Sequence, residues 1–376
     1  MLESGGFRMQ SLYVHFPFCE AKCHYCDFYS LGQERTRKGD HDRFEKALNC
    51  EIKKSGSLLA PKLDTLFFGG GTPSMTSYDS MARAIEPLWK TTQIDSRTEW
   101  TLEANPSSIH LETFRLYRAY GINRISMGIQ ALRSDLLQSL GRVHSRETAL
   151  QALENVFSAG FNNVSVDLLC GAPEQSEYDL EEAMKILTQF PITHLSCYLL
   201  TLPPHHKMYS QLPKEEVQLA HLLFIHRWMT DHGFEHYEIS NFARPGKKAR
   251  HNLKYWQGES YLGLGPSAHS YNAKSCQRWK NISSLHKYAH LLEKGESIIE
   301  WTETLNLDQL ELEKWMLALR LNDGFPIDWL KTPAQKAKAY ALELEGLLEK
   351  HPEISERKRL TPTGFALSDQ VIRALA

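Results

Sequence analysis

The chain has 376 residues, of which 42% are hydrophobic and 23% charged, a composition typical of a soluble globular protein with a large core. Its 43 Lys and Arg nearly balance its 45 Asp and Glu, so no basic field favours a nucleic-acid partner. The seven cysteines lack the pattern of a disulfide framework, and no apolar run resembles a signal peptide or a membrane span. We therefore expect a cytoplasmic protein in a reducing compartment.

The first two hundred residues alternate between short apolar runs and amphipathic segments. The apolar runs predict strands at Leu12–Phe16, Thr65–Phe68, Trp100–Ala104, Arg124–Met127, Val164–Leu168 and His194–Leu199. The amphipathic segments predict helices at His41–Lys53, Tyr78–Trp89, Leu111–Ala119, Thr148–Ala159 and Leu180–Gln189. Alternating units of this kind build a parallel sheet, and six of them are two short of a complete barrel. We therefore predict an α/β fold with a partial (βα)6 barrel over residues 11–200.

Three cysteines, Cys19, Cys23 and Cys26, follow the first predicted strand directly. Iron–sulfur clusters usually take four cysteine ligands, so three thiolates would leave one iron open for chemistry. A zinc site completed by His15 or His24 is an alternative, and three unrelated buried thiols are another. The cluster is favoured by the flanking aromatic residues Phe16, Phe18, Tyr25 and Phe28, which would keep water away from it.

Polar or glycine-rich motifs follow four of the other predicted strands. They are Gly69-Gly-Gly-Thr-Pro73, Glu103-Ala-Asn-Pro106, Gly128-Ile-Gln130 with Arg142 beyond it, and Asp167. Each one alone is more often a turn, a helix cap or a structural hydrogen bond than a ligand contact. In parallel sheets, however, ligands bind at the carboxyl ends of the strands, where all of these motifs lie. Together they predict a binding site at that edge.

The alternation of predicted strands and helices ends at about Leu200. Residues 201–300 read as an α+β extension, with a helix at Pro213–Gly233 and mixed strand and loop from Tyr237 to Tyr271. Residues 301–376 predict a small winged-helix-like domain, with elements at Leu307–Leu321, Gln335–Leu348, Arg357–Leu360 and a final helix from Pro362. This domain shows no basic recognition face, so we expect it to act as a lid or in partner docking rather than in DNA binding.

The cysteine motif and the glycine motif together resemble the radical SAM superfamily, and within it the coproporphyrinogen III dehydrogenase-like group and its heme-chaperone branch. The resemblance covers nearly the whole chain, from Tyr13 to Gly364. Its most specific strings are Tyr13-Val-His-Phe-Pro-Phe-Cys19, Gly69-Gly-Gly-Thr-Pro73, Glu103-Ala-Asn-Pro106, Tyr237-Glu-Ile-Ser-Asn-Phe-Ala243 and His251-Asn-Leu-Lys-Tyr-Trp256.

The resemblance implies a 4Fe–4S cluster on Cys19, Cys23 and Cys26, with S-adenosylmethionine (SAM) chelated to the fourth iron. The residues that it assigns to SAM binding are Tyr13, Tyr25, Gly70, Gly71, Thr72, Glu103, Gln130, Arg142 and Asp167. A sulfonium cation benefits from nearby carboxylates, and Arg142 could offset the SAM carboxylate.

The heme-chaperone branch shares the string from His251 to Trp256, which the resemblance identifies as the heme-binding segment. His251 would be an axial iron ligand, and Asn252, Tyr255 and Trp256 would complete the site. Lys247, Lys248 and Arg250, just upstream, could meet the propionates. Chemistry alone leaves another interpretation open, in which the aromatic residues are core and His251 is a structural histidine.

Two departures weigh against oxidative decarboxylation of coproporphyrinogen III. Phe28 stands where the dehydrogenase carries an extra cysteine, and only 18 residues precede Cys19. The expected function is therefore a heme chaperone, with a radical SAM oxidoreductase acting on a tetrapyrrole, or a structural zinc protein, as alternatives. The implied partners are heme, recipient hemoproteins such as membrane-bound respiratory enzymes, a reductant such as flavodoxin and a second copy of the chain. Peripheral membrane association would follow from such recipients.

Other histidines and cysteines are expected to play no part in the site. His205 and His206 are predicted to be solvated. Glu174 stands where the group commonly has glycine. Cys50, Cys170, Cys197 and Cys276 have no partner spacing and are predicted to be plain buried thiols.

Overall fold

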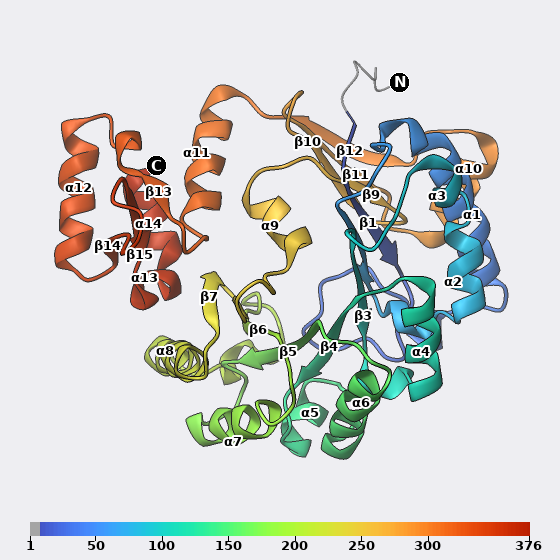
Figure 1. Ribbon diagram of the computed structural model, residues 1–376, viewed down its shortest axis with the longest axis horizontal. Coiled ribbons are helices and arrows are strands. Elements are labelled where there is room, and N and C mark those ends of the chain that lie inside the picture. The colour runs from blue at the N-terminus through green and yellow to red at the C-terminus, as the bar shows by residue number, and fades with distance from the viewer. Residues whose placement is uncertain (1–7) are drawn as a thin grey trace. The chain divides into compact units, whose positions relative to one another are not determined.

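The computed structural model describes residues 8–376, which fold as two compact units built from interleaved chain segments (Figure 1). The first unit takes the chain to Asp167 and adds residues 190–192 and 259–304. The second unit contains residues 168–189, 193–258 and 305–376. No helix among the described residues is long and apolar enough to cross a membrane.

The predicted succession of six βα units is confirmed. In the first unit, β1 (Ser11–Phe16), β2 (Thr65–Gly70), β3 (Glu99–Ala104) and β4 (Arg124–Gln130) are parallel neighbours in that order. Their side chains are buried on both faces, as in a sheet covered by helices. The connecting helices are α1 (Asp40–Ser55), α2 (Tyr78–Ile85), α3 (Leu88–Thr91), α4 (Leu111–Tyr120), α5 (Ser134–Ser139) and α6 (Arg146–Ser158).

One predicted helix, Tyr78–Trp89, is wrong as a single element. It breaks into α2 and α3 around Pro87, which is the N-cap residue of α3. Glu86 and Pro87 keep helical φ and ψ, but proline has no backbone N–H to continue the hydrogen-bond ladder and its ring crowds the carbonyl one turn back, so one helix ends before it and a second starts after it.

The first unit is completed by a segment far along the chain. β9 (Leu262–Leu264) pairs in parallel with β1, and β10 (His269–Asn272), β11 (Gln277–Asn281) and β12 (Ile299–Thr304) form an antiparallel sheet. Helix α10 (Leu285–Lys294) packs beside α1 (Figure 1). The buried Glu51 carboxylate joins the two helices, because it accepts hydrogen bonds from the Tyr288 hydroxyl (2.6 Å), the Asn281 amide (2.7 Å) and the Gly265 N–H (2.7 Å).

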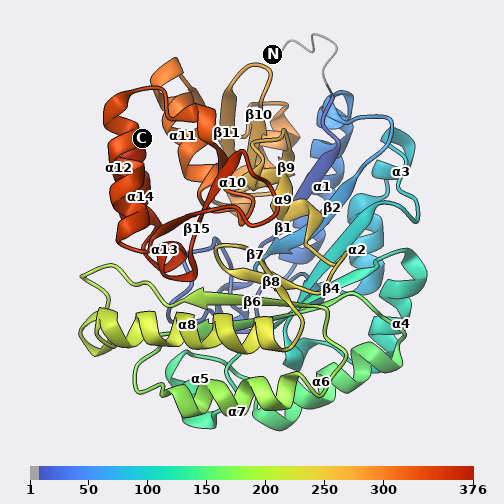
Figure 2. The ribbon, with the colours of Figure 1, turned by 60° about the vertical axis from the view of Figure 1, so that its left-hand side comes forward.

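In the second unit, β6 (His194–Leu199) lies antiparallel to β8 (Asn241–Ala243), which pairs with β7 (Glu235–Glu238). Strand β5 (Val164–Cys170) begins in the first unit and ends in the second. Helices α7 (Glu177–Leu187) and α8 (Glu215–Asp231) run beside one another (Figure 2). A Ser176–Asp179 capping box starts α7.

The C-terminal part of the second unit has the expected mixture of helices and a small antiparallel sheet. Its elements are α11 (Leu307–Ala318), β13 (Phe325–Pro326), α12 (Pro333–Leu344), β14 (Leu348–Lys350), β15 (Arg357–Leu360), α13 (Pro362–Ala366) and α14 (Ser368–Leu375). The three strands lie in the order β13-β15-β14. Trp315 forms the centre of their core, with its ring 4.9 Å from that of Phe325.

Candidate functional site

The cysteine-rich loop after β1 is held in place by backbone hydrogen bonds at both ends. The Cys19 N–H donates to the Leu31 carbonyl (2.9 Å), and the His24 N–H donates to the Leu140 carbonyl (3.1 Å). The thiols of Cys19, Cys23 and Cys26 are half-buried in this loop. Burial raises the pKa of Cys19 and of Cys26, and the neighbouring Cys23 raises both further.

The glycine motif after β2 lies directly against the cysteine loop. The Gly71 N–H donates to the Phe16 carbonyl and the Thr72 N–H to the Phe18 carbonyl, each at 2.7 Å. A Cβ atom at Gly71 would lie 2.7 Å from the Phe18 carbonyl oxygen, closer than real Cβ contacts come. The Thr72 hydroxyl reaches the Cys19 sulfur at 3.6 Å. Glycine is therefore required here for the two loops to approach.

Arg142 connects the cysteine loop to two further strand ends. Its Nη1 donates to the Cys23 sulfur (3.4 Å), and its Nη2 donates to the Asn105 side-chain oxygen and the Gly128 carbonyl, both at 2.6 Å. Asn105 in turn donates its amide to the Thr72 hydroxyl (3.1 Å). Asn105 was not among the predicted site residues, although its place in the Glu103-Ala-Asn-Pro string could have identified it.

Two carboxyl groups interact electrostatically, that of Glu103 near the end of β3 and that of Asp167 in the middle of β5. Glu103 accepts a hydrogen bond from the Gly70 N–H (3.2 Å), and the Ser126 hydroxyl contacts both oxygens of Asp167 at 3.1 and 3.2 Å. Burial and, to a smaller extent, the negative charge of Asp167 together raise the pKa of Glu103 to about 8. A buried carboxyl pair of this kind favours a cation beside it.

The remaining predicted SAM residues, Tyr13, Tyr25 and Gln130, belong to the same unit. The Tyr13 hydroxyl is 3.1 Å from Nδ1 of His15, whose Nε2 is 2.8 Å from the Tyr29 carbonyl oxygen. Burial raises the pKa of Tyr13 and of Tyr25. Gln130 has a backbone φ of 67°, a left-handed conformation that side chains other than glycine rarely adopt and that recurs at ligand sites.

The donor set fits a 4Fe–4S cluster better than a zinc ion. Both nitrogens of His15 contact other groups, and Nδ1 of His24 is 2.9 Å from the Ser139 carbonyl oxygen. His15 therefore has no nitrogen left to act as a fourth zinc ligand, whereas the His24 contact involves Nδ1 alone and does not bear on Nε2. Within residues 8–376, no three Cys, His, Asp or Glu side chains converge tightly enough to hold a metal ion, so Cys19, Cys23 and Cys26 share one loop without meeting in ligand geometry. The assignment of a 4Fe–4S cluster to this loop rests instead on its three thiols, on the charge of Arg142 beside Cys23 and on the glycine backbone that contacts the loop.

The predicted heme segment forms helix α9 (Arg250–Trp256) in the second unit. His251 is 1% exposed, and its Nε2 is 2.7 Å from the Tyr255 hydroxyl. Trp256 lies under the Arg320 guanidinium, at 5.7 Å from the ring centre. Of the cations expected to meet propionates, Lys248 pairs with Glu235 at 3.0 Å.

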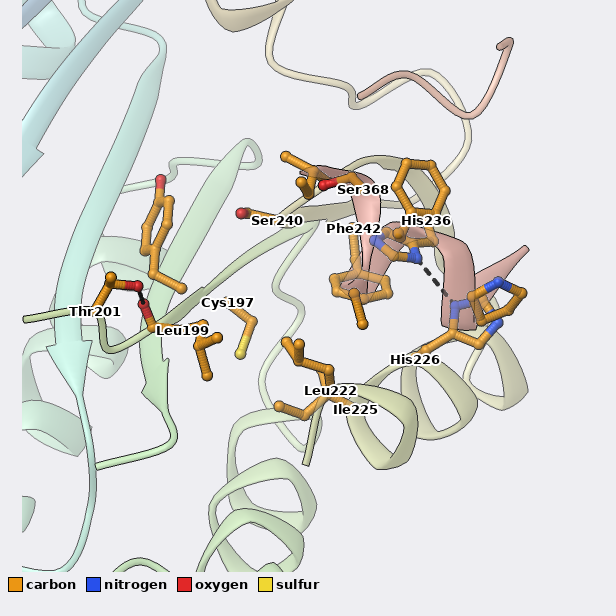
Figure 3. A pocket seen from close by; sticks show the side chains of 15 residues that line it. Cys197, Leu199, Thr201, Leu222, Ile225, His226, His236, Ser240, Phe242 and Ser368 are labelled. Atoms are coloured by element: carbon orange, nitrogen blue, oxygen red, sulfur yellow. Dashed lines mark hydrogen bonds between the residues drawn. The ribbon is translucent and has the colours of Figure 1, made fainter. Parts of the chain in front are cut away.

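A cavity of about 260 Å³ in the second unit contains none of the predicted site residues (Figure 3). Cys197 and Phe242 line it together with His226 and His236, whose Nδ1 atoms are 3.0 Å apart. Figure 3 shows the two imidazoles joined at one end of the cavity, beside Phe242. The pair is a link between α8 and β7 that the sequence did not indicate.

The structure also shows how exposed the remaining cysteines and the His205–His206 pair are. Cys170 and Cys197 are buried as expected, but Cys50 and Cys276 are only half-buried, so that prediction was wrong for the second pair. His205 is exposed as predicted, whereas His206 is half-buried and its Nδ1 accepts the Met208 N–H (3.2 Å). Glu174 has a backbone φ of 57°, which explains why glycine would suit that position.

Comparison with known proteins identifies the family of this chain. A family model described as the radical SAM superfamily matches residues 13–187. The chain is 33% identical over 97% of its length to the heme chaperone HemW of Mycobacterium tuberculosis, covering 94% of that protein. It is 32% identical over 90% of its length to HemW of Bacillus subtilis, covering 89%.

Among solved structures, the coproporphyrinogen III oxidase HemN of Escherichia coli matches with a TM-score of 0.82. The match covers 98% of this chain and 90% of that chain at 22% identity, which shows a shared fold. With the sequence relationship to HemW extending over nearly the full length of both proteins, the chain belongs to the HemW family of the radical SAM superfamily.

Proposed function

We propose that this protein is a heme chaperone, which binds heme and transfers it to hemoproteins. The observation that carries the proposal is the near full-length similarity to HemW proteins, which extends through the residues of helix α9. Membrane-bound respiratory enzymes are the proposed recipients, a flavodoxin-like protein is the proposed reductant, and the protein is proposed to form a homodimer.

In this proposal, Cys19, Cys23 and Cys26 hold a 4Fe–4S cluster that binds SAM at its open iron. When bound, the cluster would supply one electron to the sulfonium of SAM. Arg142 connects the cysteine loop to Asn105 and to the Gly128 carbonyl, and it provides positive charge beside the thiolates. Asp167 would provide negative charge beside the sulfonium, and that cation would lower the raised pKa of Glu103 and so favour its carboxylate form. Tyr13, Tyr25, Gly70, Gly71, Thr72 and Gln130 would complete the SAM site.

Heme would be bound at His251, Asn252, Tyr255 and Trp256. The aromatic side chains of Tyr255 and Trp256 offer flat surface to a porphyrin. The backbone N–H of Ala249, the N-cap residue of α9, donates to the buried Tyr237 hydroxyl (3.2 Å), which contacts His194 Nε2 at 2.8 Å. These hydrogen bonds anchor the start of α9 to the core of the second unit, so the segment is presented on a fixed scaffold.

The test is an anaerobic reconstitution followed by heme titration, transfer to an apo-hemoprotein and a coproporphyrinogen III turnover assay. A chaperone binds heme in a saturable manner, passes it to the acceptor and produces no decarboxylated product. A His251→Ala variant should bind heme more weakly, and His205→Ala, altered at an exposed residue, is its matched control and should behave as the wild type. Decarboxylated product without heme binding would instead identify a tetrapyrrole oxidoreductase.

A further inference from the structure

Helix α12 carries apolar side chains on its outer face as well as on its inner one. The inner face, with Ala339 and Leu342 buried, packs on β14 and α14 (Figure 1). On the opposite face, exposed apolar residues recur at intervals of three or four and form one row, namely Pro333, Ala337, Tyr340, Ala341 and Leu344. An ordinary surface helix has polar or charged side chains on that face. This apolar row is therefore a feature that folding alone does not explain.

The two large side chains of the apolar row are highly accessible. Tyr340 is 62% exposed and Leu344 is 72% exposed. They are four residues apart, about one turn of the helix, so the ring and the isobutyl group lie next to each other. Their burial against an apolar phase would be favourable, because it removes apolar surface from water.

Exposed lysines surround the apolar row. Lys336 and Lys338 lie on opposite sides of it by their helical positions, and Lys331 precedes the helix. Within residues 8–376, the ammonium groups of these three lysines make no ion pair. The free charges at this face are therefore mainly positive.

The acidic residues of α12 do not cancel this charge. Glu343 pairs with Lys358 of β15, so its carboxylate is already neutralised. Glu345 is exposed, but it is the C-cap residue and lies beyond the last turn of the helix. The surroundings of the apolar row are thus positive along most of its length.

We propose that α12 is a docking helix for an anionic membrane surface, with Tyr340 and Leu344 inserted among the headgroups and the lysines beside the lipid phosphates. An apolar row with basic side chains on its flanks is typical of helices that lie in the membrane interface. Tyrosine suits this boundary, since its ring is apolar and its hydroxyl stays hydrated. The surface shares no residue with the proposed cluster and heme sites, so this docking goes beyond the proposed function and does not require heme.

Charge favours a membrane over a second copy of the chain as the occupant. Two copies that met through the apolar row would bring the lysines of one α12 towards those of the other, and like charges at an interface oppose association. An anionic bilayer instead attracts every exposed lysine. A row with two large side chains is also small for a stable protein interface, whereas it suits reversible contact with a bilayer.

The docking should depend on anionic lipid and on salt. Each lysine near an anionic surface contributes roughly fivefold in binding, and insertion of the Leu344 side chain contributes about tenfold. Neither contribution alone gives firm binding, so both are needed. Salt screens the lysines, and binding should weaken as the ionic strength rises.

The test is co-sedimentation of the full-length protein with vesicles of phosphatidylcholine and phosphatidylglycerol in equal parts, compared with vesicles of phosphatidylcholine alone. The α12 variants are Lys336→Gln and Leu344→Ser. Their matched controls are Lys53→Gln, at an exposed lysine of α1, and Leu307→Ser, at a leucine of α11 that is 83% exposed. Hydrogen exchange of the wild type with and without vesicles locates the contact without any substitution.

We expect the wild type to bind the mixed vesicles, to bind phosphatidylcholine alone with far lower affinity, and to dissociate in high salt. Lys336→Gln should bind roughly fivefold more weakly and Leu344→Ser about tenfold more weakly, whereas both controls should bind as the wild type does. Hydrogen exchange in α12 should slow when vesicles are added. Circular dichroism separates weak binding by a folded variant from misfolding.

Four results would overturn the proposal. They are absence of vesicle binding by the wild type, equal binding to both kinds of vesicle, wild-type binding by both α12 variants, and hydrogen exchange in α12 that slows with protein concentration in the absence of lipid. The last result would identify a second copy as the occupant. Binding that appears only when the vesicles carry a reconstituted integral hemoprotein would also overturn it, in favour of a protein partner. No readout involves heme, so none of these results would count against the proposed chaperone function.

Discussion

Replacing Arg142 by lysine should loosen the cysteine loop without removing a charge. The guanidinium makes three hydrogen bonds in fixed directions, to the Cys23 sulfur, the Asn105 side chain and the Gly128 carbonyl. An ammonium group is a compact point charge and cannot reproduce that fork. Losing two hydrogen bonds from a charged donor costs about 3 kcal/mol, which corresponds to roughly 100-fold in binding. We expect SAM affinity and cluster retention to fall by that order.

The assay is anaerobic cluster reconstitution, followed by SAM titration with the cluster spectrum as the readout. Arg115→Lys is the matched control, because Arg115 pairs with Glu112 at 2.6 Å on an exposed face of α4 and should contribute less than about 1 kcal/mol. If Arg142→Lys kept its cluster and bound SAM within about threefold of the wild type, the three contacts would not matter for the site, and the reasoning would be refuted.

Three further outcomes are expected. Burial raises the pKa of Glu51 to about 7, so the folded protein binds this proton more tightly than the unfolded chain does. The free energy of unfolding in urea should therefore fall by up to ~3 kcal/mol as the pH rises from 4.5 to 7. Glu51→Gln should make the free energy of unfolding less dependent on pH in that window. Trp315→Ala should cost about 3–5 kcal/mol in thermal unfolding, whereas Leu344→Ala, at a residue that is 72% exposed, should cost little. Cys26→Ser should lose the brown cluster absorbance that Cys276→Ser retains; equal loss in both would contradict the ligand assignment.

Much of the fold could be predicted because the parallel strands are apolar on both faces. Runs such as Arg124–Met127 and His194–Leu199 stand out in a sequence for that reason, and both are strands in the structure. The return of β9 to pair with β1 could not be predicted, since Leu262–Leu264 is three residues long and its partner is some 250 residues away. A pairing between such distant segments leaves no local pattern.

The candidate site could be predicted where residue type alone indicates chemistry, as with the cysteines and the glycine motif. The roles of Asn105 and His15 could not be predicted, because they depend on which side chains these residues contact. Asn105 bridges Arg142 and Thr72, and His15 connects the Tyr13 hydroxyl to the Tyr29 carbonyl. Such contacts are properties of the folded chain: Asn105 lies in a recognisable motif and His15 beside the cysteines, but the sequence position of neither residue reveals its partners.

The discontinuous path of the chain has a consequence for how this protein is made on the ribosome. Glu51 sits in α1, yet its three hydrogen-bond donors are on Gly265, Asn281 and Tyr288. Until those residues leave the exit tunnel, α1 lacks partners for a buried carboxylate, and β1 lacks its neighbour β9. Strand β1, which precedes the cysteine loop, therefore gains its second neighbour only late in translation, and we expect a cluster to be inserted after synthesis rather than during it.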